Sequence, residues 1–153
     1  SLASLWVSSY WGLFTVGRIL IGIFADRFPN NLIMRVCMAG VVVGAALLWL
    51  HPSDELGAIG LAILGFSQAP VFAILISDTP KRVGAAHVAN AIGFQVGFAG
   101  LGIAVLPGIG GVIAARYGAD TIGPYLFVLV ILLVIIHEVI ILHDRRTLEK
   151  AKR

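Results

Sequence analysis

The stretch Gly17-Arg-Ile-Leu-Ile-Gly-Ile-Phe-Ala-Asp-Arg27 lies at the end of an apolar run and carries charge at both ends. Arg18, Gly22 and Asp26 are four residues apart, so they share one stripe of a helix. A glycine in such a stripe lets a neighbouring helix approach closely. Asp26 and Arg27 follow where the apolar run stops, which predicts that they lie at a membrane surface.

Composition extends this prediction to the whole chain. Of its 153 residues, 59% are hydrophobic and only 12% are charged, and the mean hydropathy is +0.98. Soluble domains are about 45–50% apolar and about 25% charged, so a membrane protein is expected. The net charge of +3 does not indicate nucleic-acid binding, because the basic residues form no patch with interleaved aromatics. The single cysteine, Cys37, cannot form an internal disulfide and is expected to be a packing residue.

Five apolar runs predict the architecture, at about residues 5–25, 32–50, 56–76, 88–115 and 125–142. Each is near or above the ~18–20 residues that cross a bilayer as a helix. Lipid offers backbone groups no water, so helices rather than open strands are expected. The prediction is an all-α membrane protein, with a transmembrane domain over 1–143 and a basic tail over 144–153.

The start of the chain leads to two further expectations. The first residue is Ser, and an apolar run follows almost at once without a charged leader or cleavage site. A signal peptide is therefore not expected. We interpret the chain as a fragment of a longer polypeptide.

The basic residues predict the orientation. If the connectors alternate between the two sides, one side holds nine of them: Arg27, Arg35, Lys81, Arg82, Arg145, Arg146, Lys150, Lys152 and Arg153. The other side holds only Arg116, and Arg18 lies within a span. The positive-inside rule then places the tail and the Asp26–Arg27 connector in the cytoplasm and the N-terminus outside, in a cell (inner or plasma) membrane.

The pattern Gly-Arg-x-x-x-Gly-x-x-x-Asp-Arg resembles the loop signature of the major facilitator superfamily of secondary transporters. That signature lies at the cytoplasmic end of the second and eighth transmembrane helices. If the Asp-Arg loop follows helix eight, the five runs resemble helices eight to twelve of the C-terminal six-helix half. Helix seven and the N-terminal half of the same polypeptide are then missing partners.

Three further segments resemble the sugar and fucose permease-like branch of the superfamily. They are Ser9 to Arg18, Gly65 to Phe72, and Thr79 to Gly84 together with the Ala-Asn-Ala-Ile-Gly-Phe-Gln segment that ends at Gln95. The chain departs from the family where Phe-Pro-Asn-Asn replaces the familiar basic continuation after Asp26 and Arg27.

Polar side chains within the spans supply the candidate substrate-binding residues. The span at 32–50 has no charged or amide side chain between Arg35 and His51, which predicts a lipid-facing support helix. The first, third and fourth spans are more polar, and the resemblance implies that these line the central cavity. The candidates are Gln68, Gln95, Tyr10, Trp11 and Asn90.

Each candidate has a structural alternative. An unpaired Gln68 amide in hydrocarbon costs several kcal/mol, so it faces a wet cavity or makes a helix–helix hydrogen bond of about 0.6–2 kcal/mol. Pro70 nearby breaks a backbone bond and can leave a carbonyl free. Gln95 and Asn90 diverge by about 140° round the helix, so they would not serve one ligand, and Asn90 is equally a cap or packing residue. Tyr10 and Trp11 would stack on a sugar or belong to the interfacial aromatic belt.

The remaining candidates concern gating and coupling. Arg18 is expected to be structural, and the resemblance implies that Asp26 and Arg27 belong to the cytoplasmic gate, with Gly22 in the same stripe. Asp78 is a gate residue or a solvated carboxylate. Glu138, beside His137, is a proton carrier or contacts a neighbouring helix.

The glycines of the fourth span are candidates for helix–helix contacts. Gly93 and Gly97 are four residues apart and predict close helix contacts, either for a hinge or for tight packing.

No enzyme motif occurs in the sequence, and the scattered histidines give no metal spacing, so no cofactor and no metal are expected. We predict proton-coupled secondary transport (symport) of a small polar solute, a sugar, by alternating access. The alternative within the class is a drug or metabolite efflux carrier. The alternative from another class is a non-transporting receptor or scaffold.

Overall fold

The computed structural model describes residues 2–24, 27–50 and 53–151, and every regular element in these ranges is helical. The long helices are α1 (Leu2–Phe24), α2 (Asn30–Leu50), α3 (Asp54–Gln68), α4 (Val71–Val83), α5 (Val88–Tyr117) and α6 (Ile122–Ala151). Single helical turns, η1 (Ala85–His87) and η2 (Ala119–Thr121), precede α5 and α6.

Four stretches of the described chain are long and apolar enough to cross a membrane: Asn30–Leu50, Glu55–Val83, Ala85–Tyr117 and Ala119–Asp144. The helix α1, with 23 residues, packs beside them. The chain is therefore an all-α membrane protein, as the sequence predicts.

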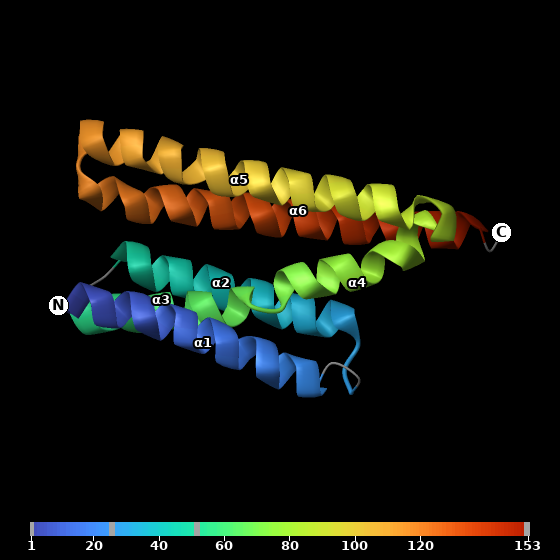
Figure 1. Cartoon of the computed structure of the whole chain (residues 1–153), viewed down its shortest axis with the longest axis horizontal. Helices are drawn as coiled ribbons and strands as arrows, with labels where there is room; N and C mark the ends of the chain where they lie inside the picture. Colours follow the sequence, from blue (N-terminus) through green and yellow to red (C-terminus); the bar gives the residue numbers. More distant parts are fainter. Residues whose placement is uncertain (1, 25–26, 51–52, 152–153) are drawn as a thin grey trace.

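The helix α2 lies at the centre of the arrangement, between α3 on one side and α6 on the other (Figure 1). It supplies buried residues to both hydrophobic clusters: Val41 and Ala45 to the first, and Met34 and Met38 to the second. This central position was not predicted; α2 also exposes Leu32, Val36 and Val43, so the lipid-facing support helix expected over 32–50 stays a prediction. Its apolar sequence could not reveal the central position, because protein interior and lipid are equally apolar surroundings.

Glycines allow α2 and α3 to approach closely. A Cβ atom on Gly44 would lie 2.8 Å from the Gly60 carbonyl oxygen, and one on Gly60 would lie 2.9 Å from the Gly44 carbonyl oxygen. Gly40, one turn earlier, lies against the side chain of Ser67. Close packing of this kind drives helix association in lipid, where apolar burial contributes little.

The predicted third span is interrupted at Ala69–Pro70, between α3 and α4. Pro70 has no N–H to donate to the carbonyl of Phe66, so the break at this proline is confirmed. Both residues of the break keep right-handed helical dihedral angles, so α3 and α4 still follow one another across one candidate span. The span begins after Ser53, whose hydroxyl accepts a hydrogen bond from the N–H of Leu56 at 3.3 Å.

The helix α5 is the most exposed of the spans. Among the described residues it contacts α4, α6 and the two short turns, but not α1, α2 or α3. A Cβ atom added to Gly93 or Gly97 would have no neighbour within 4 Å in the part of the chain that the structure describes. The close contacts predicted at these glycines are therefore not made among the described residues. Gly84 lies in the loop before α5 and Gly118 in the loop after it. Their φ angles of 72° and 96° are ones that other residues rarely adopt.

Candidate functional site

The break between α3 and α4 is the point where α1 meets the interrupted helix. Ala69 and Pro70 are both buried. Arg18 Nε donates a long hydrogen bond of 3.4 Å to the carbonyl oxygen of Ala69. The guanidinium carbon of Arg18 also lies 4.9 Å from the centre of the Phe14 ring, a cation–π contact. Arg18 therefore ties α1 to the break.

Gly17 makes the closest approach in this region. A Cβ atom there would lie 2.7 Å from the Phe66 carbonyl oxygen and 3.0 Å from the Ala69 Cβ atom. The Phe66 carbonyl is the one deprived of a helical donor by Pro70. Among the described residues, nothing lies within 4 Å of the Cβ position of Gly22, so the close approach expected there stays a prediction. The face of α1 that meets α3 contains Gly17 instead.

Gln68 ends α3 directly before the break and is partly buried. Within the described part of the chain, its amide makes no hydrogen bond. The neighbouring Ser67 side chain lies against Gly40 of α2. A partly buried amide next to an interrupted helix has the chemistry needed to bind a solute hydroxyl.

Gln95 lies on α5 and faces α4. Its Oε1 atom is 2.9 Å from the hydroxyl oxygen of the buried residue Thr79, which is also 2.9 Å from the carbonyl oxygen of Leu75. One hydroxyl proton can serve only one of these acceptors at a time. The Gln95 amide therefore keeps capacity for another hydrogen-bond partner.

We expect Thr79→Val and Gln95→Leu to be coupled in their effect on stability. Each substitution removes one partner of the α4–α5 hydrogen bond. The double variant should therefore lose less stability than the two single variants lose together. The coupling free energy should be about 0.6–2 kcal/mol, the range for such bonds in membranes. Reversible unfolding of the four proteins in detergent measures it, and strictly additive losses would contradict the pair.

The other predicted substrate residues are not brought to one place. Tyr10 packs on α3, since a Cβ atom on Gly65 would lie 2.7 Å from its carbonyl oxygen and 2.9 Å from its ring. Trp11 is 59% exposed and its ring contacts those of Tyr10 and Phe14. Asn90 is exposed near the start of α5. Gln68 and Gln95 lie on helices that do not contact each other in the described chain.

The predicted gate residue Asp78 joins two helices. Its Oδ1 atom accepts hydrogen bonds from Asn30 Nδ2 at 2.7 Å and from Lys81 Nζ at 2.9 Å. The start of α2 is thereby linked to the end of α4. Asp26 lies outside the described residues, and Arg27 is exposed.

Two ion pairs that sequence reasoning missed hold α6 to its neighbours. Arg82 on α4 lies 3.3 Å from Asp144 on α6, and Arg35 on α2 lies 3.0 Å from Glu138 on α6. The positive-inside rule predicts that Arg35, Arg82 and the tail share one side of the membrane, but it could not identify partners that are distant in the sequence.

Glu138, the predicted proton carrier, is thus paired with Arg35. Its other carboxylate oxygen lies 3.6 Å from Nδ1 of His137, whose side chain is only 8% exposed. That Nδ1 atom is buried and has no hydrogen-bond partner in the described structure. Among the described residues, no group of three or more metal-ligating side chains is present.

Comparison with known proteins places the chain in a family. The family model of the Major Facilitator Superfamily matches residues 1–153, so the chain belongs to this superfamily of membrane transporters. It is a multi-pass membrane protein.

The chain is also similar to uncharacterized MFS-type transporters from three Pseudomonas aeruginosa strains, including LESB58 and UCBPP-PA14. The identity is 26% over 116 residues, which is 76% of this chain and 29% of each relative. The matched region therefore spans less than a third of the length of these relatives. No significant match to a solved structure was found.

Proposed function

We propose that the chain is part of a secondary active transporter that carries a small polar solute, a sugar, by alternating access. The observation that carries the proposal is the interruption of a membrane span at Ala69–Pro70 with the Gln68 amide beside it. Substrate sites of secondary transporters are built around discontinuous helices near the bilayer midplane. A scaffold or receptor has no need of an interrupted span with an unpaired amide.

The resemblance to the sugar and fucose permease-like branch supports a sugar as the solute. Amides such as those of Gln68 and Gln95 both donate and accept hydrogen bonds, which suits a hydroxyl-rich molecule. The cluster of Arg35, Glu138 and His137 supports coupling to protons, because a carboxylate and an imidazole can both exchange them. The nine-to-one distribution of basic residues supports a cytoplasmic C-terminus.

Uptake by cells that express the full-length protein tests this proposal. We expect saturable uptake of one labelled monosaccharide from a panel, and loss of that uptake when a protonophore is added. Uptake that persists with the protonophore would exclude proton coupling but not transport. No uptake of any sugar, with the protein shown to be in the membrane, would contradict the sugar assignment and favour an efflux carrier.

A further inference from the structure

The imidazole of His137 on α6 is a buried group with an unused bonding atom. Its Nδ1 atom is enclosed by the described residues and makes no hydrogen bond with them. Buried polar atoms in proteins almost always have a hydrogen-bond partner. The Oε1 atom of Glu138 lies 3.6 Å from Nδ1, which is just too far for a hydrogen bond. The two atoms therefore lie where one added proton could join them.

Arg35 on α2 holds the other oxygen of the same carboxylate. Its Nη2 atom lies 3.0 Å from Oε2 of Glu138, so this ion pair links α2 to α6. When the neutral imidazole carries its proton on Nε2, Nδ1 presents a lone pair to Oε1, and two acceptors face each other. A proton on Nδ1 turns this contact into a charge-assisted hydrogen bond, which is about 2.7–2.9 Å long.

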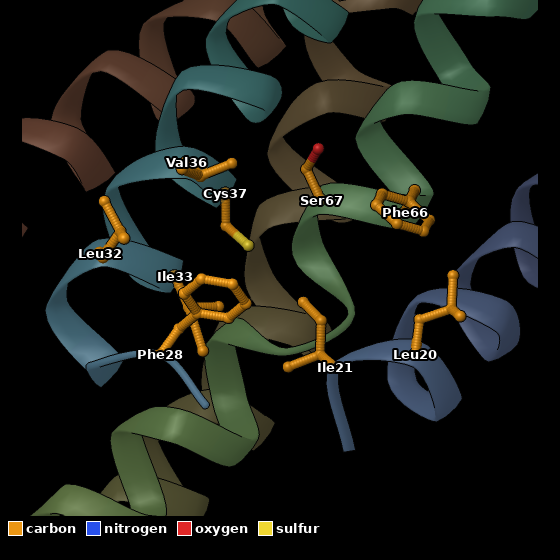
Figure 2. A pocket seen from close by; sticks show the side chains of 9 residues that line it. All are labelled: Leu20, Ile21, Phe28, Leu32, Ile33, Val36, Cys37, Phe66 and Ser67. Atoms are coloured by element: carbon orange, nitrogen blue, oxygen red, sulfur yellow. The ribbon is translucent and has the colours of Figure 1, made fainter. Parts of the chain in front are cut away.

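Few other ionisable side chains lie on the two long helices that contact α6, which are α2 and α5. Besides Arg35, α2 carries only Cys37. Figure 2 shows Cys37 on the face of α2 that is turned to α1 and α3, with Leu20 and Phe66 nearby. The helix α5 has no ionisable side chain over residues 88–115. Arg35 is therefore the charged group that these helices bring to the carboxylate.

The remaining charged groups around α6 are paired or distant. Those of α4 form ion pairs with one another or with the end of α6: Asp78 with Lys81, and Arg82 with Asp144. Along the chain, Asp120 and Tyr125 lie about 18 Å or more before His137, and His143 lies about 9 Å after it. Glu138 is thus the anion that His137 meets among the described residues.

We propose that His137 binds the coupling proton at Nδ1, with the ionised Glu138 as its hydrogen-bond acceptor and Arg35 as the positioning residue for that carboxylate. This inference rests on the proton coupling proposed above and names its site. The proton adds to the Nδ1 lone pair and no other bond breaks. The three side chains together change from neutral to one positive charge.

The ion pair with Arg35 decides between His137 and Glu138 as the residue that keeps the proton. A protonated Glu138 would leave Arg35, which lies within a candidate membrane span, without its counter-charge. A protonated His137 preserves that ion pair and gains a hydrogen bond. A buried imidazolium is unfavourable alone, and the adjacent carboxylate offsets this cost.

The burial of the two side chains indicates the route of the proton. The Glu138 side chain is 39% exposed in the described structure, whereas Nδ1 of His137 is enclosed. The carboxylate oxygen Oε1 therefore takes up the proton transiently and passes it to Nδ1, after which Glu138 is ionised again. Because Nδ1 is already enclosed, another part of the polypeptide cannot contact it without moving α6.

Nitrogen-15 NMR of the full-length protein with labelled histidine, in detergent, tests the site without any transport. The signals of His137 are those missing from His137→Gln. The matched control is His143→Gln, which makes the same substitution further along α6, in a polar pocket. Glu138→Gln removes the anion and retains the size of the side chain.

We expect the Nδ1 signal of His137 to change from an unprotonated to a protonated nitrogen between about pH 8 and pH 5, where imidazoles ordinarily titrate. In Glu138→Gln, His137 should bind the proton at least about tenfold more weakly, the effect of losing a neighbouring opposite charge. His143→Gln should leave the titration unchanged. An imidazole that stays neutral down to pH 5, or that titrates identically in Glu138→Gln, would overturn the proposal.

Transport in proteoliposomes separates this inference from the proposed function. His137→Gln should abolish sugar accumulation driven by a proton gradient but retain counterflow, which needs no net movement of protons. His143→Gln should retain both activities. Accumulation that persists in His137→Gln would overturn the proposal, and loss of counterflow as well would indicate a structural role instead. If the unsubstituted protein carries no sugar, the proposed function fails, and the NMR titration still decides whether His137 binds the proton.

Discussion

Replacing Gly17 by leucine should lower the free energy of unfolding by about 3 kcal/mol, at the upper end of the cost of overpacking. The new side chain would start 2.7 Å from the Phe66 carbonyl oxygen and 3.0 Å from the Ala69 Cβ atom. A backbone oxygen cannot move aside as a flexible side chain can, so α1 must separate from α3. That separation would also break the hydrogen bond from Arg18 to Ala69. Reversible unfolding of the full-length protein in detergent measures the loss.

Gly12→Leu is the matched control for this variant. It makes the same substitution in the same helix, but apart from the helix's own nearby backbone and the two adjacent residues, no atom of the described chain lies within 4 Å of the new Cβ position. Any gain in helix propensity is then common to both variants. If both leucines lower stability equally, the contact between Gly17 and the break does not hold α1 in place.

Replacing Gln68 by leucine should reduce transport about tenfold at low solute concentration while leaving stability within about 0.5 kcal/mol. The amide has no hydrogen bond among the described residues, so its loss removes none of their hydrogen bonds. A solute hydroxyl bound by the amide would lose its partner, at a cost of about 1.5 kcal/mol. The initial rate of solute uptake and the unfolding transition of the same preparation give the two quantities.

Two further variants sharpen this test. Gln68→Asn retains the amide on a shorter side chain and should restore part of the transport. Gln95→Leu should lower both transport and stability, because it also removes the contact with Thr79. A Gln68→Leu variant that transports normally would remove Gln68 from the solute site. If Gln68→Leu lowers both transport and stability, Gln68 instead makes a helix–helix hydrogen bond in the full-length protein.

The sequence was sufficient to predict the helical fold and the break at Pro70. Length and apolar composition determine which segments can be helices in lipid, and a proline inside such a segment removes a hydrogen bond whatever surrounds it. The expectation that Arg18 is structural rests on the same local reasoning. The partner of Arg18 at Ala69, which is 51 residues away in the chain, could not be predicted in this way.

The residues that depend on helix packing were harder to predict. The spacing of Arg18, Gly22 and Asp26 predicts a stripe on one helix, but only the packed structure shows that α1 meets α3 through Gly17. The pair of Arg35 and Glu138 is separated by 103 residues, and no local pattern joins them. The central position of α2 was missed because apolar side chains suit lipid and protein equally well.

Counterflow in proteoliposomes tests the central claim, transport by alternating access, most directly. Vesicles containing the purified full-length protein are loaded with an unlabelled monosaccharide, and entry of the labelled sugar is followed without any ion gradient. A carrier that exposes one site to each side in turn predicts a transient accumulation of label above its external concentration. Label that only equilibrates at the rate of protein-free vesicles, for every sugar in the panel, would contradict a sugar carrier.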